Sequence, residues 1–305
     1  MKKITHTILT FVISLASMSL MAQNPSFHWA NTMGSTTADA GESITTDAAG
    51  NVLATGYFTQ TVDFDPGTGS ANLSSPYGNG GYIQKLDASN NLVWAKVLYP
   101  TSGSYCMPLE ITSDASSNVY VTGYFSGSVD FNPGTGTSTL TSAGGTDIFI
   151  VKLNSSGTFV WAKRMGAASD DIGYGIAVDA SGNVFTTGSF RNTADFDPGA
   201  GTVNLSSNGL DDIFIQKLNS SGTYQWAYSW GSTGADEGRS LAIYSSGNIA
   251  IVGNFIGTVD FATTSGFLNK TSSGNSDVFV HYLDGSTGAA FTPDIYGGTL
   301  NDYAY

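Results

Sequence analysis

The chain of 305 residues has little that could rigidify it covalently, and it has few positive charges. Its single cysteine, Cys106, cannot form an internal disulfide. We therefore expect a free buried thiol and a fold held together by core packing or bound ions. Only 11 Lys and Arg stand against 24 acidic residues, and the net charge is −13. Such a surface repels nucleic acid and anionic lipid, and it suits metal cations, basic proteins or neutral glycans.

The sequence also lacks a hydrophobic run as long as the ~20 residues that a membrane-spanning helix needs. Its longest apolar stretch, Ile8 to Met21, follows two lysines and precedes Ala22. This three-part pattern is typical of a cleavable secretory signal. We expect cleavage after Ala22, which makes residues 1–22 a signal peptide. The sequence thus predicts a secreted or cell-surface protein without membrane insertion, and the net charge after cleavage is −15.

Glutamate is scarce as well, with 3 Glu against 21 Asp, while Gly reaches 38. Aspartate and glycine favour turns over helices, because Asp competes for backbone hydrogen bonds and Gly adopts positive φ. We therefore expect an all-β chain with almost no helix after the signal. At 41% hydrophobic and 12% aromatic residues, it can still bury a sizeable core.

Two kinds of residue recur with one period along the chain. The tryptophans repeat at intervals of 65, 67 and 65 residues, and glycines repeat at 67, 65 and 65. These positions are Trp29, Trp94, Trp161 and Trp226, and Gly56, Gly123, Gly188 and Gly253. A fixed period of this length indicates stacked repeats. We define repeat units at about 29–93, 94–160, 161–225 and 226–290, with the start of a fifth unit at 291–305, within a repeat region 23–305.

Each unit contains four short strands. In the third copy we expect them at Gly175 to Val178, Asn183 to Phe190, Asp212 to Leu218 and Thr223 to Ser229. The second strand is mostly apolar on both alternating faces, as in Val119 to Phe125, so it must be covered on both sides. Four-stranded antiparallel sheets stacked face to face around an axis meet this need. The sequence therefore predicts a β-propeller, with its extra residues in a long segment such as Asp195 to Leu210.

The run Gly-Ile-Ala-Val-Asp-Ala-Ser-Gly-Asn-Val at Gly175 to Val184 resembles the secreted bacterial β-propeller repeats known as SBBP. The resemblance extends from about Trp29 to the end of the chain, and it implies a propeller scaffold without an agreed activity. The fourth copy departs from the pattern. It has Tyr244 where Asp is expected and Phe291 where Trp is expected.

The ends of the repeat region predict an open, incomplete propeller. The chain begins after the signal with a fourth-strand sequence around Trp29, and the last unit supplies its own fourth strand near Phe291. The tail 297–305 resembles the approach to another first strand. Propellers have roughly four to eight blades, so we expect an arc of four repeats that continues into further units.

Because antiparallel strands alternate direction, the loops from strand two to three and from strand four to one share a face. Acids gather in these long loops: Asp39, Glu42, Asp65, Asp170, Asp171, Asp197, Asp236 and Glu237. Functional residues concentrate on such scaffolded loops. The alternative is that acidic loops only keep an exported protein soluble.

The sharpest motif is Asp-Phe-Asp-Pro-Gly, which starts at Asp63 and recurs with variations at Asp130, Asp195 and Asp260. Acids two residues apart in an extended strand point to one side and could begin a calcium site. The candidate ligands are Asp63, Asp65, Asp130, Asn132, Asp195, Asp197 and Asp260. Asx-Pro-Gly also starts turns in which the side chain caps the backbone. We favour the turn, because Asn132 keeps the capping oxygen but lacks the charge.

No catalytic or cofactor-binding residue is predicted, and calcium is the one cofactor considered. His281 occupies a position held elsewhere by Gln84, Val151 and Gln216, which argues against a catalytic role. We interpret the chain as an exported, non-catalytic scaffold that binds a protein or glycan through its acidic long-loop face. The alternatives are an extracellular propeller enzyme acting on polysaccharide and a calcium-stabilised structural repeat protein. An enzyme would gather unusual residues near the axis, where Glu42, Glu110 and Arg239 are the charged exceptions.

Overall fold

The computed structural model describes residues 30, 32–244 and 247–304. The chain divides into two units, Met1–Thr32 and Met33–Tyr305, and the fold described here is that of the second. The signal segment 1–22 and Trp29 lie outside the described residues. Every element of regular secondary structure assigned in the described part is a β-strand, which confirms the all-β prediction. Within the same residues, no helix has the length and apolar character needed to cross a membrane.

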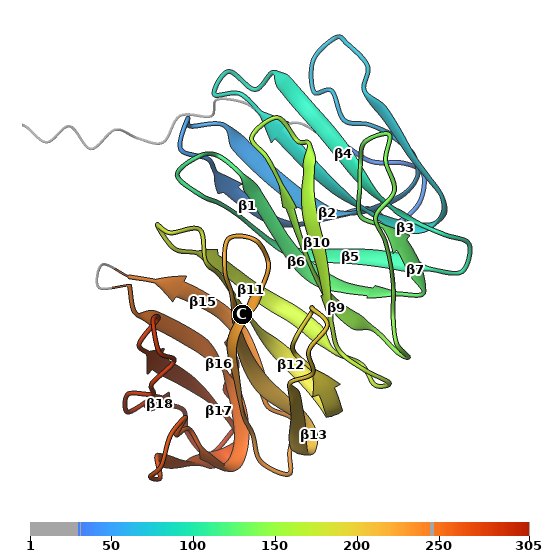
Figure 1. Cartoon of the computed structure of the whole chain (residues 1–305). Coiled ribbons are helices and arrows are strands. Elements are labelled where there is room, and N and C mark those ends of the chain that lie inside the picture. Colours follow the sequence, from blue (N-terminus) through green and yellow to red (C-terminus); the bar gives the residue numbers. More distant parts are fainter. Residues whose placement is uncertain (1–29, 31, 245–246, 305) are drawn as a thin grey trace, which may run out of the picture. The chain divides into compact units, whose positions relative to one another are not determined.

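The strands form four antiparallel sheets, blades 1 to 4 (Figure 1). Blade 1 contains β1 (Ala40–Thr46), β2 (Val52–Asp63), β3 (Asn72–Leu86) and β4 (Leu92–Pro100). Blade 2 contains β5 (Tyr105–Ser113), β6 (Val119–Ser126), β9 (Asp147–Leu153) and β10 (Phe159–Met165). Blade 3 contains β11 (Ile172–Val178), β12 (Val184–Asp195), β13 (Asn204–Leu218) and β14 (Tyr224–Trp230). Blade 4 contains β15 (Glu237–Ile243), β16 (Ile249–Asp260), β17 (Asn269–Leu283) and β18 (Asp294–Tyr296).

Strands two and three of a blade continue outward as a hairpin. Half of the segment predicted as a long loop, Asp195 to Leu210, is strand, because β12 runs to Asp195 and β13 begins at Asn204. Cross-strand hydroxyl pairs 2.7 to 2.8 Å apart join the two arms: Thr61–Ser74, Ser128–Thr141, Thr193–Ser206 and Thr258–Thr271. These arms are polar, so the hydrophobic pattern that marks a buried strand does not reveal them.

In blade 2 this hairpin forms two separate strands, β7 (Ser128–Asp130) and β8 (Thr139–Thr141). They extend the sheet of blade 1, because Tyr99 and Pro100 of β4 pair with Asp130 and Val129 of β7. A bridge between Gly166 and Asp195 makes the same connection from blade 2 to blade 3. Each of these hairpins therefore rests against the last strand of the preceding blade.

The recurring glycine on strand two is required by close backbone approach. A Cβ placed on Gly56, Gly123, Gly188 or Gly253 would lie within 2.0 Å of a carbonyl oxygen of strand one. The strand-one register shifts beside each of these contacts, for example between Gly173 and Gly175. A β-bulge of this kind bends and twists the strand, and only a residue without a side chain fits opposite it.

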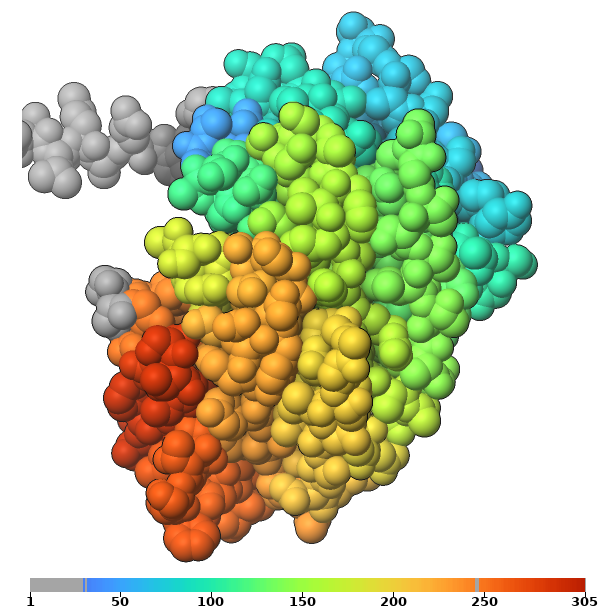
Figure 2. Space-filling model, in the orientation of Figure 1, coloured from blue at the N-terminus to red at the C-terminus, as the bar shows by residue number. Residues whose placement is uncertain are grey.

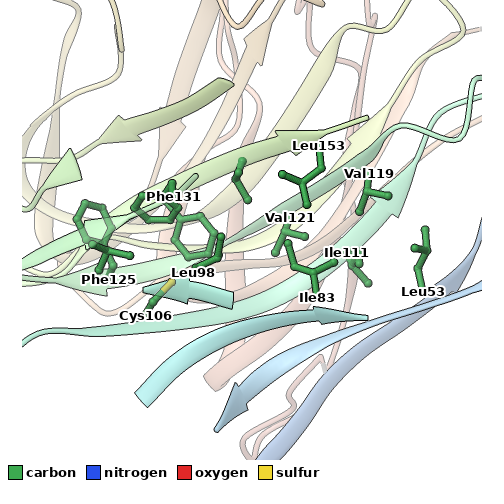
Figure 3. Packing of buried hydrophobic residues seen from close by; sticks show 13 residues of the cluster. Leu53, Ile83, Leu98, Cys106, Ile111, Val119, Val121, Phe125, Phe131 and Leu153 are labelled. Carbon is green, nitrogen blue, oxygen red and sulfur yellow. The ribbon is translucent and has the colours of Figure 1, made fainter. Parts of the chain in front are cut away.

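Apolar side chains from neighbouring blades interlock at each junction. Between blades 1 and 2, Leu53, Ile83 and Leu98 meet Phe125 and Phe131 in one buried cluster (Figure 3). Cys106 belongs to this cluster and is fully buried, as predicted for a free thiol. Two further clusters join blade 2 to blade 3 and blade 3 to blade 4. The facing sides of neighbouring blades are therefore buried at all three junctions.

The stack is an open arc, which confirms the prediction of an open propeller. No described strand of blade 4 pairs with blade 1 (Figure 1). Ile44 on β1 is 70% exposed, whereas its equivalents Ile111 and Ile176 are 3% exposed. At the other end, Tyr296 of β18 is 56% exposed, whereas the equivalent Trp230 is 2% exposed. Blades follow one another in chain order across the surface shown in Figure 2.

Each blade also holds the next one by polar contacts to a hairpin carbonyl. Lys152 and Trp161 of blade 2 both donate to the Ser220 carbonyl of blade 3, at 3.3 and 3.2 Å. Lys85 and Trp94 of blade 1 donate in the same way to the Ser155 carbonyl. In blade 4 the two donors are replaced by Tyr282 and Phe291. The recurrent Lys and Trp thus have a structural role in joining blades.

The Trp161 contact can be tested by replacing Trp161 with Phe, the residue that blade 4 carries at the equivalent position. We expect the free energy of unfolding to fall by about 1–2 kcal/mol, because a hydrogen bond and some buried area are lost. Urea denaturation measures the change. Phe291→Trp is the matched control, and at a residue 46% exposed it should change stability by less than about 0.5 kcal/mol. Equal stability of Trp161→Phe and the unmodified chain would contradict the role of this contact.

One buried core position differs in chemistry between blades. Gln84 Nε2 donates to the Phe64 carbonyl at 2.7 Å, and Gln216 Nε2 donates to the Phe196 carbonyl at 2.5 Å. At the equivalent place His281 is fully buried, with its ring 4.8 Å from Trp230 and 5.2 Å from Phe261. Burial lowers the pKa of His281 to about 4. The imidazole is therefore neutral in the folded protein at neutral pH.

Because of this pKa, we expect the folded protein to lose stability in acid, and we expect His281→Gln to remove that loss. Between about pH 6.5 and pH 4 the unfolded chain binds a proton at His281 while the folded chain does not, so stability falls as the pH falls through this window. The loss amounts to about 3 kcal/mol when complete. Gln is native at two equivalent positions and should fit. We expect thermal melts to show His281→Gln gaining stability relative to the unmodified chain at pH 4.5 but not at pH 7.5. A parallel pH dependence of the two proteins would refute this assignment.

Candidate functional site

The repeated Asp-Phe-Asp-Pro-Gly segments form one turn in the hairpin of each blade. Asp195 Oδ1 accepts backbone N–H bonds from Asp197 at 3.0 Å and Val203 at 2.8 Å. Asp197 Oδ1 then accepts the Gly199 N–H at 2.8 Å. The phenylalanine between the two acids, Phe196, is fully buried. The motif therefore anchors the hairpin tip to the core and satisfies its backbone donors.

The other copies follow the same geometry. The first acid accepts two backbone N–H groups, two and eight residues further on, at Asp63, Asp130 and Asp260. These backbone donors lower the pKa of the Asp63 carboxyl. Asp65 and Asn132 accept from Gly67 and Gly134 in the way that Asp197 accepts from Gly199. The carboxamide of Asn132 thus replaces a carboxylate without changing the turn.

Among the described residues, no group of three or more His, Cys, Asp or Glu side chains is arranged to hold a metal ion. Each predicted ligand pair, such as Asp195 and Asp197, directs one oxygen to backbone N–H groups. Calcium normally takes six to eight oxygen ligands, so water and backbone carbonyls would have to complete such a site. Calcium binding at these seven residues stays a prediction.

The acidic loops divide into buried and exposed members. Asp171 and Asp236 are fully buried and add no surface charge, contrary to the sequence prediction. Asp171 Oδ2 and Oδ1 accept the N–H groups of Ala167 at 2.9 Å and Arg191 at 3.1 Å. Asp236 binds the N–H groups of Ser232 and Ile256, and Asp39 those of Ser35 and Thr59. These three acids therefore connect the loop before strand one to strand two.

The acids that remain at the surface are Glu42 and Asp170, which are exposed, and Asp39, Asp65, Asp197 and Glu237, which are partly exposed. Glu237 forms an ion pair with Arg239. The guanidinium of Arg239 also lies over the ring of Tyr174, 4.5 Å from its centroid. One of the three charged exceptions noted on the first strands, Arg239, thus lies over an aromatic ring.

Four partly exposed tyrosines lie on the first two strands of blades 1 to 3, whose first strands β1, β5 and β11 lie side by side (Figure 1). This tyrosine row consists of Tyr57, Tyr105, Tyr124 and Tyr174. The rings of Tyr105 and Tyr124 are 6.3 Å apart and meet edge to face. Burial raises the pKa of Tyr124, and Tyr105, Glu42 and Tyr57 add to the rise. Burial also raises the pKa of Tyr174, with Glu237 as a further cause.

Sequence reasoning missed the tyrosine row, because its tyrosines do not recur at one position through all four repeats. Tyr57 and Tyr124 each follow the repeated glycine of strand two, but Ser189 and Asn254 stand there in the later blades. Tyr105 and Tyr174 lie on the first strands of different blades. The signal in the sequence that could have found this row was the occurrence of tyrosines near the few charged residues of the first strands.

Glu110 lies on β5, the same strand as Tyr105, and its Oε2 accepts the Ile176 N–H of blade 3 at 2.5 Å. Burial raises the pKa of Glu110 to about 7, although the Ile176 N–H opposes the rise. At the equivalent place in blade 1, Ser43 Oγ accepts the Ile111 N–H. Glu110 therefore joins two blades at the inner edge.

The turn interpretation of the Asp-Phe-Asp-Pro-Gly segment can be tested at Asp195. Asp195→Asn keeps the oxygen that accepts two N–H groups, so we expect the free energy of unfolding to change by less than about 0.5 kcal/mol. Asp195→Ala removes that oxygen and should cost about 1–2 kcal/mol. Both are measured by urea denaturation in the presence of a chelator. A loss of stability in Asp195→Asn as large as in Asp195→Ala would contradict the turn interpretation.

Comparison with known proteins agrees with this architecture. Residues 160–189, which include β10, β11 and part of β12, match the family model SBBP, described as a β-propeller repeat. An uncharacterized WD repeat-containing protein of Acanthamoeba polyphaga mimivirus is 28% identical over 198 residues, which cover 56% of this chain and 14% of that protein. The regulatory protein FlaEY of Caulobacter vibrioides is 25% identical over 163 residues, covering 52% of this chain and 16% of that protein.

The chain therefore spans a small part of the length of the curated relatives that it matches. The chain is a repeat scaffold of stacked β-propeller blades, and its residues 160–189 are similar to the SBBP β-propeller repeat.

Proposed function

We propose that this chain is an exported, non-catalytic binding scaffold that captures a protein or glycan ligand through the tyrosine row and the acids beside it. The tyrosine row carries the proposal. Its tyrosines are partly exposed on a stack of sheets, and Arg239, which is paired with Glu237, lies over the ring of Tyr174.

The chemistry of the tyrosine row favours a ligand with both apolar and polar faces. Tyrosine offers a flat apolar surface and a hydroxyl that remains available for hydrogen bonding, at low cost in side-chain entropy. The carboxylates of Glu42 and Glu237 accept hydrogen bonds from sugar hydroxyls or from basic side chains. The net charge of −13 adds a long-range preference for neutral or basic partners.

The scaffold and the relatives give further support. The residues of the tyrosine row come from strands of three blades, and the aspartates that connect loop to strand keep those strands in place. One relative is named as a WD repeat-containing protein and another as a regulatory protein. Both names are compatible with a scaffold that acts by binding. Export is proposed from the signal pattern at 1–22.

A second candidate, an enzyme acting on polysaccharide, rests on Glu110. Its pKa of about 7 lies in the range that suits a proton donor or acceptor at neutral pH. Its Oε2, however, is already bonded to the Ile176 N–H between two blades. We therefore rank binding first.

Screening the purified chain on a glycan array and a peptide library, followed by calorimetry on the best ligand, tests the proposal. We expect Tyr124→Ala combined with Tyr174→Ala to weaken binding at least about tenfold, because each ring contributes about 1 kcal/mol of contact. Tyr77→Ala is the matched control, since Tyr77 is 61% exposed on β3 and lies outside the tyrosine row. An equal loss in the control would disprove the proposed location, and turnover of any polysaccharide would favour the enzyme.

A further inference from the structure

Buried aspartates also recur on the third strands of blades 2, 3 and 4, at the start of β9 and within β13 and β17. Asp147, Asp212 and Asp277 are fully buried, and their Oδ2 atoms accept the N–H of the residue four positions earlier. The Oδ1 atoms of all three are buried without a hydrogen-bond partner. An unpaired buried carboxylate oxygen is costly, so each of these atoms requires an explanation.

These aspartates face the buried aspartates that connect loop to strand in the next blade. A Cβ placed on Gly166 would lie 2.7 Å from Asp171 Oδ2 and 3.0 Å from Asp147 Oδ1, so both carboxylates border one small space. At the following junction Asp212 lies against Gly231, while Asp236 Oδ2 accepts the N–H of the next residue, Ser232, and the Asp236 N–H donates to the Asp211 carbonyl. Blades 2 and 3, and blades 3 and 4, are therefore each joined at a pair of buried acids.

The two members of a pair are present or absent together. At the junction of blades 1 and 2, Gly80 replaces the first acid, since it pairs with Phe58 as Asp147 pairs with Phe125. Cys106 replaces the second acid, because it lies 17 residues before Gly123, as Asp171 lies 17 residues before Gly188. Joint replacement indicates that the two carboxylates act as a unit.

The pairs at the junctions of blades 2 and 3 and of blades 3 and 4 differ in how their charge is balanced. Arg164 Nη1 lies 2.5 Å from Asp147 Oδ2 and supplies a positive charge to the first pair. The equivalent residue at the second pair is Ser229, because Arg164 pairs with Phe149 and Ser229 with Phe214. Of the four ion pairs among the described residues, none includes Asp212 or Asp236. The second pair has no positive side chain bonded to it.

The side-chain amide of Asn208 lies close to two oxygen atoms at this second pair. Its Nδ2 lies 3.3 Å from Asp212 Oδ2 and 3.1 Å from the Gly231 carbonyl oxygen, so two oxygens converge on the position of the amide. The equivalent residue at the arginine-bearing pair is Ala143, which lies four positions before Asp147. The pair that lacks arginine therefore has the Asn208 amide and the Gly231 carbonyl beside it.

We propose that Asp212 and Asp236 hold a hard, oxygen-preferring cation of the calcium class at the junction of blades 3 and 4. The Gly231 carbonyl and the amide oxygen of Asn208, turned toward the ion, supply further ligands, and water completes the coordination. The ion takes the place that Arg164 fills at the neighbouring junction. With two protein carboxylates, a dissociation constant of about 10⁻⁴–10⁻³ M is expected, which is typical of extracellular calcium modules.

Calcium titration followed by thermal unfolding tests this site, using the full chain at pH 7.5 and constant ionic strength. At tenfold excess over the dissociation constant, the melting temperature of the unmodified chain should rise by about 3 °C. Asp212→Asn should abolish the response. Asp147→Asn, at the pair that has its own arginine, should leave the response intact, and so should Asp195→Asn in the hairpin turn.

Ser229→Arg provides a second variant that reproduces the arginine-bearing pair. We expect it to melt higher than the unmodified chain without calcium and to lose the calcium response. The absence of a saturable response in the unmodified chain would overturn the proposal, as would a response that survives Asp212→Asn. Stabilisation by acid alone, with no effect of calcium at any pH, would also overturn it and would assign a shared proton to the pair.

Discussion

Burial of both faces of every sheet is the constraint on which this structure depends. A four-stranded sheet with apolar residues on both faces exposes one of them unless another sheet covers it, so each blade is stabilised mainly by its neighbours. Ile111 and Ile176 are 3% exposed inside the stack, whereas Ile44 is 70% exposed at its end. The same chemical group is thus core or surface according to whether a blade precedes it.

Polar groups then fix the relative position of the blades that apolar contact brings together. The carbonyls of Ser155 and Ser220 each accept bonds from a lysine and a tryptophan of the preceding blade. Asp171 and Asp236 hold the loop that enters each blade. Apolar contact alone is tolerant of sliding, whereas a hydrogen bond to one carbonyl is not. This division of roles accounts for the recurrence of Lys, Trp and Asp at repeat positions.

Functional variation is tolerated where the repeat constraint is weakest. The inner edge strands present side chains that neither fill a junction nor cap a turn, and there the repeats differ: Glu42, Tyr174 and Arg239 occupy equivalent positions in blades 1, 3 and 4. Residue types that recur at the same repeat position stabilise the fold. Residue types that differ between repeats, on the inner edge strands, distinguish the surface of one blade from that of another. Loops supported by a rigid scaffold commonly divide their roles in this way.

The sequence by itself determined the class of fold, the period and the strands of each blade, because these follow from local signals: alternating apolar residues, Asx and Gly turns, and recurrent Trp and Gly. It also indicated the turn at Asp195-Phe196-Asp197 and the buried thiol of Cys106. Only the tertiary structure decided which acids are buried, since Asp170 and Asp171 are neighbours in sequence yet one is exposed and the other is not. It likewise assembled Tyr57, Tyr105, Tyr124 and Tyr174 into one row and brought Asp212 against Asp236. These groupings join residues of different blades, and the distance between such residues depends on how whole sheets stack, which no local pattern encodes.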